Sequence, residues 1–208
     1  MSSARLDLRR ARGRDTRALI LDAAREMLAE CGFAATTTRA IAERAGVQLS
    51  LVHYHFGGKQ QLLAAVLARE NELLLERQRA LFAGPEPLAE KWRTACAYLH
   101  EDLRSGYVRI LWELWSVGLS DDELRRLWLE AIDGWRELLT DVAGSWADEH
   151  ALELPLTPRA LATLVGDLFL GAETMILAGD DDELHVAGLD AVTALIDWAE
   201  REGRGRSR

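Results

Sequence analysis

Residues 36–59 read TTTRAIAERAGVQLSLVHYHFGGK, and this stretch decides how the N-terminal part of the chain folds. Three threonines at 36–38 offer hydroxyls that can cap a short helix over about 38–45. Gly46 breaks that helix, because glycine can take the positive φ that a tight turn demands. A second short helix is expected over about 48–56. The stretch therefore predicts two short helices joined by a tight turn.

The two sides of this helix pair differ in chemistry. The apolar side chains that can turn inward are Ile41, Val47, Val52 and Phe56. The side chains left on the outer face of the second helix are Gln48, Leu49, Ser50, His53 and Tyr54. This is the arrangement of a helix-turn-helix, in which the second helix enters the major groove of DNA.

The same stretch resembles the signature of the TetR family of transcriptional regulators. The residues that match in order and spacing are Thr38, Ile41-Ala42, Ala45-Gly46-Val47, His53-Tyr54-His55-Phe56 and Lys59, followed by Leu62-Leu63. At motif level the match covers about residues 15–66. The resemblance implies an all-α fold with an N-terminal three-helix DNA-binding head and a C-terminal helical body for ligand binding and dimerisation.

The resemblance also assigns DNA-binding residues. Those expected at the phosphate backbone are Thr38, Arg39, Tyr54 and Lys59. Those expected at base edges are Gln48, Leu49, Ser50 and His53. Glutamine can make a paired contact to adenine, and leucine can touch a thymine methyl group. The family often has Ser or Thr at position 48, Gly at 50 and Tyr at 53, so the contacts at these positions are expected to differ from those of relatives.

Apolar residues recur at helical spacing along nearly the whole chain, which predicts about nine helices and no strand. The expected ranges are about 15–31, 38–45, 48–56, 59–81, 87–104, 107–118, 121–149, 158–178 and 182–202. Gly32 is expected to end the first of them. Thr157 and Pro158 are expected to be the cap and first residue of the eighth.

The expected helices and the composition of the chain predict four segments. They are a disordered basic arm (1–14), a helix-turn-helix DNA-binding domain (15–58), a helical ligand-binding and dimerisation domain (59–203) and a frayed tail (204–208). The net charge is −9, yet residues 1–59 carry +4 and residues 60–208 carry −13. This asymmetry favours a basic, DNA-facing head on an acidic body. A disordered arm rich in arginine can still reach phosphates or a minor groove.

Several classes of protein are disfavoured. No run reaches about 18 uncharged apolar residues, which argues against a membrane span, and the first residues lack the apolar stretch of a secretory signal. Cys31 and Cys96 lie in apolar helical patterns and are expected to be buried thiols of a cytoplasmic protein. His53 and His55 lie two apart on a helix and so point to different sides, which disfavours a metal site. No catalytic residue or cofactor is expected, because no phosphate loop or nucleophile–base pair is present.

All seven tryptophans lie after residue 90, where they can pack the core or line a ligand pocket. The resemblance implies a cavity among helices five to eight. Its expected ligand-binding residues are Trp92, Cys96, Leu99, Leu103, Trp112, Trp115, Trp128, Trp135, Phe169 and Glu173. Glu173 interrupts an apolar face, where it could hold a cationic ligand or form an ion pair across a dimer. The expected ligand is an apolar, aromatic or cationic small molecule.

The last two helices carry apolar stripes. The resemblance implies that they form a four-helix homodimer interface, with expected residues Leu161, Leu164, Val165, Leu168, Ala172, Leu184, Val192, Leu195 and Ile196. A two-fold dimer would bind a palindromic operator with half-sites about one helical turn apart. The expected function is a repressor released by a small-molecule inducer. The alternative is a helical sensor or interaction protein whose DNA-binding head is not functional.

Overall fold

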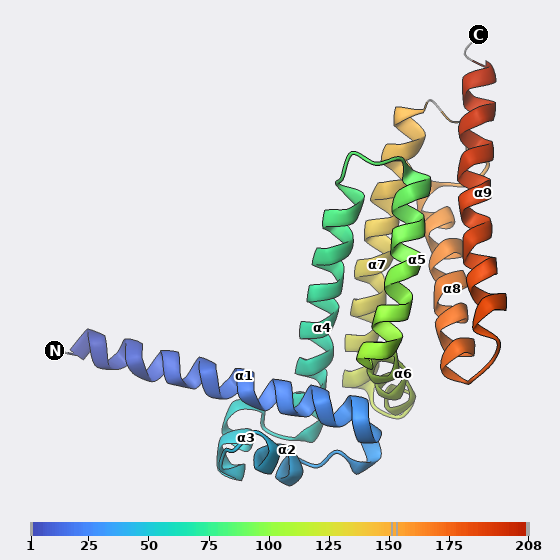
Figure 1. Cartoon of the computed structure of the whole chain (residues 1–208). Helices are drawn as coiled ribbons and strands as arrows, with labels where there is room; N and C mark the ends of the chain where they lie inside the picture. Colours follow the sequence, from blue (N-terminus) through green and yellow to red (C-terminus); the bar gives the residue numbers. More distant parts are fainter. Residues whose placement is uncertain (1, 151, 153, 207–208) are drawn as a thin grey trace. The chain divides into compact units, whose positions relative to one another are not determined.

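The computed structural model describes residues 2–150, 152 and 154–206, with side chains from residue 13 to residue 201 of these ranges. The described residues form nine helices and no strand (Figure 1). In chain order the helices are α1 (Ser2–Ala35), α2 (Thr38–Arg44), α3 (Leu49–Phe56), α4 (Lys59–Phe82), α5 (Leu88–Ser105), α6 (Tyr107–Gly118), α7 (Asp122–Glu149), α8 (Pro158–Leu177) and α9 (Asp182–Arg206). The predicted all-α class is therefore confirmed.

Side-chain caps begin two of the helices as the sequence indicates. The Thr37 hydroxyl accepts a hydrogen bond from the Ala40 N–H at the start of α2. The Thr157 hydroxyl does the same for Ala160 at the start of α8, where Pro158 is the first helical residue. The first N–H groups of a helix have no partner within the helix, so these hydroxyls determine where α2 and α8 begin.

Two helix ends differ from the prediction. Helix α1 begins at Ser2 rather than near residue 15, and it therefore includes most of the segment 1–14 that was expected to be disordered. Residues 2–14 contain no proline and are rich in Ala, Leu and Arg, so they extend a helix that is already nucleated. Helix α9 runs to Arg206 instead of about 202. Residues 207 and 208 of the predicted tail lie outside the described residues.

Gly32 interrupts α1 as expected. Its φ of 76° and ψ of 176° are not helical, and a short helical stretch then resumes as far as Ala35. This backbone conformation is almost restricted to glycine. The chain therefore turns at Gly32 on its way to α2.

The described residues divide into two compact units. The first contains the residues up to Glu70 together with Arg109–Trp128, and the second contains Asn71–Val108 together with the residues from Leu129 onward. Helix α4 contributes Lys59–Glu70 to the first unit and its remainder to the second. The predicted DNA-binding domain, 15–58, lies wholly in the first unit.

The apolar core of the first unit comes from short and long helices together. Ile20 of α1, Ile41 of α2, Val52 of α3 and Leu62 of α4 are fully buried. Helices α2 and α3 pack on each other, and α2 packs on α1. Burying these large side chains holds the two short helices in place, because helices of seven or eight residues are unstable alone.

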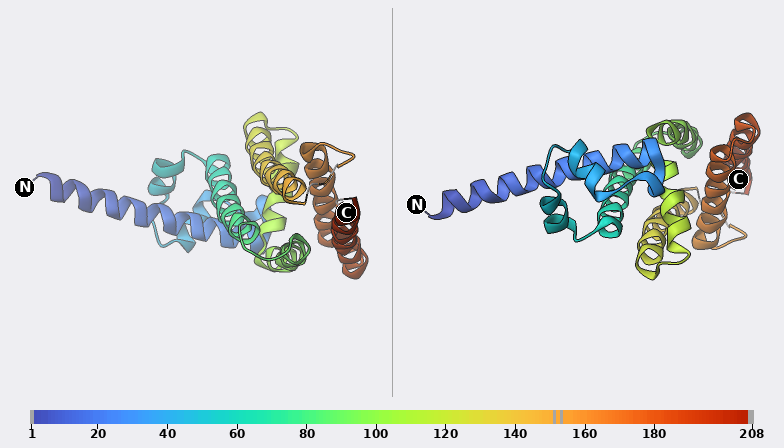
Figure 2. Two further views of the ribbon diagram at one scale, coloured as in Figure 1. Left: turned by 90° about the horizontal axis from the view of Figure 1, so that it is seen from above. Right: turned by 90° about the horizontal axis from the view of Figure 1, so that it is seen from below.

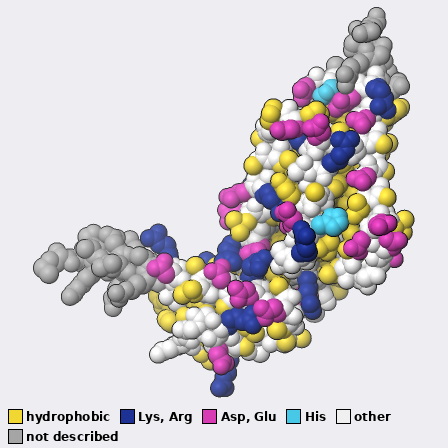
Figure 3. All heavy atoms as spheres, in the orientation of Figure 1, with side chains coloured by type: hydrophobic (Ala, Val, Ile, Leu, Met, Phe, Trp, Pro, Cys, Tyr) yellow, Lys and Arg dark blue, Asp and Glu magenta, His cyan; other side chains and the backbone are white. Residues whose placement is uncertain are grey.

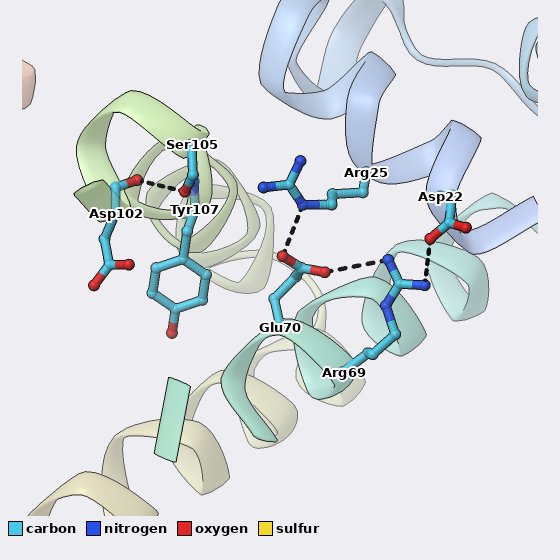
Figure 4. Close-up of polar contacts among 7 residues, drawn as sticks. All are labelled: Asp22, Arg25, Arg69, Glu70, Asp102, Ser105 and Tyr107. Carbon is cyan, nitrogen blue, oxygen red and sulfur yellow. Dashed lines mark hydrogen bonds and ion pairs between the residues drawn. The ribbon is translucent and has the colours of Figure 1, made fainter. Parts of the chain in front are cut away.

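Ion pairs reinforce the contact between α1 and the first part of α4 (Figure 4). Arg25 lies 2.8 Å from the Glu70 carboxylate, and Arg69 lies 2.7 Å from Asp22. Arg69 also reaches Glu70 at 3.2 Å, so that the four side chains form one network. Such a network fixes the register of α1 against α4 more than any single surface pair would.

In the second unit, α5 packs against α8 and α9, and α8 and α9 lie side by side (Figures 1 and 2). The Trp92 indole N–H donates to the Leu189 carbonyl at 2.8 Å. Cys96 is buried, and burial raises the pKa of its thiol to about 12, with a further contribution from Asp190. Cys31 in the first unit is exposed, so its predicted burial was wrong. It directly precedes Gly32, where the helix and its buried face end.

Candidate functional site

Helix α3 has a buried side and an exposed side. Val52 is fully buried and Phe56 is 8% exposed, so these two side chains anchor the inner face of the helix. The exposed predicted base-contacting residues are Gln48, Leu49, Ser50 and His53. Tyr54 is 81% exposed. The structure therefore brings the predicted residues of α3 together on one accessible surface.

Gln48 stands at the N-cap of α3 and makes no capping hydrogen bond with its side chain. This agrees with the low preference of glutamine for that position. Its amide, which carries two donors and an acceptor, therefore remains free for another partner. A side chain at the leading end of a recognition helix is well placed to read a base edge.

Helix α2 contributes one free cation beside this surface. Arg39 is exposed, and no described residue forms an ion pair or hydrogen bond with its guanidinium. Arg44, one helical turn further on, is instead bound to Glu30 at 2.7 Å, and this hydrogen bond raises the pKa of Arg44. Thr38 is half-buried. Arg39 is therefore the side chain of α2 best suited to neutralise a phosphate.

Lys59, the first residue of α4, is held inside the first unit. Its ammonium donates to the Phe33 carbonyl at 2.7 Å and lies 4.0 Å from the centre of the Phe33 ring. Burial lowers the pKa of Lys59. An ammonium has three donors, so two remain after this contact. Phosphate binding by Lys59 stays a prediction, and its observed contact is with the end of α1.

Glu113 on α6 is a contact that sequence reasoning missed. Its carboxylate accepts a hydrogen bond from the Phe33 N–H. The same carboxylate forms an ion pair with Arg109, at 3.1 Å from the Arg109 Nε atom. The Phe33 backbone is thus held on both sides, by Lys59 of α4 and by Glu113 of α6. An acidic residue within the apolar pattern of 107–118 is the only trace of this contact in the sequence.

The predicted ligand-binding residues fall into two aromatic clusters in different units. In the first unit, Trp112 meets Trp115 edge to face at 5.5 Å and Trp128 at 6.1 Å. The indole N–H groups of Trp112 and Trp128 have no hydrogen-bond partner among the described residues. In the second unit, Phe169 meets Trp92 edge to face at 6.3 Å and Trp135 in a stacked arrangement at 6.4 Å.

The remaining predicted ligand-binding residues belong to the second unit. Cys96 and Leu99 are buried, and Leu103 is half-buried. Glu173 is 6% exposed, and its Oε2 atom has no partner among the described residues. Burial, assisted by the nearby charge of Asp102, raises the pKa of Glu173 to about 8. Because the side chain is buried inside its own unit, an ion pair across a dimer is a poor explanation for it.

The second unit also has a cleft of about 540 Å³ that the sequence did not indicate. It is lined by the end of α4, the start of α5, and parts of α7 and α9, and none of the predicted ligand residues lines it. In its wall the Trp146 indole N–H donates to Glu200 at 3.1 Å. His150 lies 3.8 Å from the same carboxylate.

Helices α8 and α9 expose an apolar surface. Leu164, Leu184 and Leu195 are each more than 60% exposed, and Leu168 is 41% exposed. Figure 3 shows hydrophobic side chains at the surface of this part of the molecule. By length and composition alone α8 is long and apolar enough to cross a membrane, and most of it is not buried in the protomer.

Not every residue predicted for this interface reaches the surface. Leu161, Val165 and Val192 are half-buried, and Ala172 and Ile196 are buried within the protomer, where they pack its core. Met175 and Trp198 are exposed large apolar residues that sequence reasoning missed, at 43% and 57% exposure. The interface residues were predicted from the spacing of apolar residues along α8 and α9. Spacing alone does not tell which apolar residues face the protomer core and which face outward.

Comparison with known proteins agrees with this geometry. Residues 20–66 match the family described as "Bacterial regulatory proteins, tetR family". The HTH-type transcriptional regulator TtgW of Pseudomonas putida is 42% identical over 67 residues, which are 32% of this chain and 50% of that relative. The matched segment thus spans half the length of TtgW.

Solved structures extend the likeness to nearly the whole chain. A TetR-family transcriptional regulator from Pectobacterium atrosepticum is 26% identical, with a TM-score of 0.71, over 91% of this chain and 96% of that chain. A transcriptional regulator from Saccharomonospora viridis in complex with choline is 21% identical, with a TM-score of 0.69, over 85% and 94% of the two chains. The second likeness shows the fold alone. The N-terminal part of the chain thus matches the tetR-family model, and the chain is similar in fold over nearly its whole length to a solved TetR-family transcriptional regulator.

Proposed function

We propose that the protein is a repressor that binds a palindromic operator as a homodimer and leaves it when a small-molecule inducer binds. The observation that carries this proposal is the outward face of α3. Its inner side chains are buried, whereas Gln48 and Tyr54 are accessible and have no role in the core. A polar recognition surface on a buried scaffold is what direct readout of bases requires.

Helices α8 and α9 supply the proposed dimer interface. Their exposed leucines would be covered by the same surface of a second copy, as in a two-fold dimer. Dimerisation would also explain why an apolar helix such as α8 is largely unburied in one protomer. A dimer presents two copies of α3, which matches the two half-sites of a palindrome.

The inducer site is proposed for the second unit, around Trp92, Trp135, Phe169 and Glu173. Aromatic rings with one buried polar group are typical of small-ligand sites. Helix α4 runs from the second unit into the first, where Lys59 contacts the Phe33 carbonyl. Movement of α4 on ligand binding would therefore act on the segment that leads to α2. Ligand and DNA must then weaken each other's binding by the same factor.

The proposal includes a cytoplasmic location, where the operator is accessible, and it assigns no catalytic step to the protein. The test is fluorescence anisotropy of labelled DNA from beside the gene, with and without candidate ligands. Binding that falls steeply with salt and is reversed by one ligand supports a repressor. Ligand binding without any DNA binding would favour a helical sensor with a non-functional head.

A further inference from the structure

Glu173 is an isolated acid in an apolar setting. It is 6% exposed, and its Oε2 atom has no hydrogen-bond partner among the described residues. Phe169 precedes it by one helical turn on the same face of α8, and the adjacent Ala172 is also buried. An ionised carboxylate in such a place is costly unless a cation or several donors meet it.

The described residues nearby do not supply that cation. Arg77 of α4 lies 2.6 Å from Asp102 of α5 and 3.6 Å from Glu101, and its guanidinium also covers the Tyr98 ring at 4.2 Å. Asp102 is the charged group that acts on Glu173, and as a like charge it disfavours ionisation of Glu173. Arg77 is thus paired with Asp102 and Glu101, and no described residue forms an ion pair with Glu173. An ionised Glu173 would therefore have no cationic partner among the described residues.

A cluster of aromatic rings includes Phe169, which lies one helical turn before Glu173 on α8. Phe169 is in ring contact with Trp92 of α5 at 6.3 Å and with Trp135 of α7 at 6.4 Å. Aromatic faces attract cations, and the attraction grows when water is excluded. A carboxylate one helical turn from such a cluster is suited to an organic cation with apolar substituents.

We propose that Glu173 is the charge-selecting residue of the inducer site and that the ligand is an organic cation of the alkyl- or arylammonium class. The proposal rests on the proposed function, because it specifies the ligand of the same site. The cation pairs with the Glu173 carboxylate, and its apolar groups lie against Phe169 and the two tryptophans. The proton that Glu173 carries in the free protein is released to the buffer on binding.

This exchange makes binding depend on pH. Burial raises the pKa of Glu173 to about 8, so the free protein carries the proton at neutral pH. A permanent cation must displace that proton, so its affinity should rise about tenfold per pH unit between pH 6 and 8 and then level off. The other titratable group that acts on Glu173 is Asp102, whose pKa burial raises and whose pairing with Arg77 at 2.6 Å opposes that rise.

The test compares two probes that differ only in charge, benzyltrimethylammonium and its neutral carbon isostere neopentylbenzene. Binding to the full-length protein is measured by calorimetry and tryptophan fluorescence in the absence of DNA, from pH 6 to 9. The variant is Glu173→Gln. The control is Glu200→Gln, which removes a carboxylate from the separate cleft of the same unit. Circular dichroism confirms that both variants fold.

The proposal expects the cation to bind at least tenfold more tightly than its isostere at pH 8, with close to one proton released at pH 7. Glu173→Gln should abolish both the preference and the pH dependence, and Glu200→Gln should keep them. Equal binding of the two probes, failure of the cation to bind, or loss of binding in Glu200→Gln alone would overturn it. Operator binding is measured separately, so that protein which binds DNA but no cation refutes this inference and leaves the proposed function standing.

Discussion

At the scale of single residues, Tyr54 offers the most direct probe of the DNA interface. Its side chain is 81% exposed, so Tyr54→Phe should remove the hydroxyl and leave the fold unchanged. Losing one hydrogen bond to a phosphate should weaken DNA binding by about 1.5–3 kcal/mol. Because phosphate contacts carry no sequence information, anisotropy should show similar losses on operator and random duplexes. Unchanged affinity on both would remove Tyr54 from the interface.

Gln48 occupies the N-cap position of α3 without capping it and is the proposed reader of a base edge, and these two features can be tested separately. Gln48→Ser should stabilise α3 by about 1 kcal/mol, because serine can cap the N–H groups that glutamine leaves uncapped. The same change should relax base preference at one position of each half-site. Urea denaturation measures the first effect, and competition binding with single-base operator variants measures the second. A more stable protein with unaltered preference would place Gln48 outside the readout.

Replacing Gly32 tests the turn between α1 and α2. Gly32→Ala puts a side chain at φ 76°, and its Cβ would lie 2.5 Å from the Glu113 carboxylate. Destabilisation of about 1–3 kcal/mol is expected from the backbone conformation alone. Gly13→Ala is the matched control in the same helix, because nothing lies within 4 Å of its added Cβ. It should be neutral or stabilising in the same denaturation experiment, and equal effects of the two changes would contradict this account of the turn.

Glu173 should make stability depend on pH. Its pKa is about 8 in the folded protein, above the ordinary value of 4.5, so the folded state holds a proton that the unfolded state releases. This contribution is fully present below about pH 4.5 and is lost as pH rises through 8. In urea denaturation from pH 5 to 9, Glu173→Gln should lose less stability than the wild type as pH rises. Parallel curves for the two proteins would show that Glu173 is not buried as described.

At the scale of helices, the proposed homodimer depends on the apolar surface of α8 and α9. Leu164 on α8 and Leu119 after α6 are both 61% exposed, but only Leu164 lies on the apolar α8–α9 surface. If the proposed dimer forms, Leu164→Glu should convert it to a monomer, because the change places a charge in the proposed interface. Light scattering coupled to gel filtration measures the mass. Leu119→Glu should leave the dimer intact, and a Leu164→Glu protein that remains dimeric would refute this interface.

Helix positions were largely predictable because their signals are local. Thr37, Thr157 and Pro158 act on neighbouring residues only, so the sequence itself shows where α2 and α8 begin. The start of α1 was missed because a polar, arginine-rich segment suggests disorder even when its residues favour helix. The exposure of Cys31 was missed because the turn at the next residue ends the buried face of the helix.

The candidate site was predictable to different degrees in its two parts. The outward residues of α3 follow from the 3.6-residue period within one motif. The contact between Glu113 and Phe33 spans eighty residues, and no periodic pattern reports it. The separation of Trp112, Trp115 and Trp128 from Trp135 is likewise a matter of tertiary packing, since α7 itself passes from one unit into the other.

At the scale of the whole molecule, the charge distribution explains how an acidic protein can hold DNA. Net charge is −9, yet residues 1–59 carry +4. Within that segment Arg39 keeps its guanidinium free while Arg44 is neutralised by Glu30. Residues 1–59 therefore carry a net charge opposite in sign to that of the chain as a whole. The acidic remainder disfavours nonspecific binding elsewhere on the protein.

The central claim is that two copies of α3 read a palindrome. Selection of bound duplexes from a random DNA pool by the wild-type protein, followed by sequencing, tests it most directly. The account predicts enrichment of inverted repeats whose half-sites lie about one helical turn apart, and Tyr54→Phe should give weaker enrichment of the same sequence. A pool without enrichment, or with a single unrepeated site, would contradict the account.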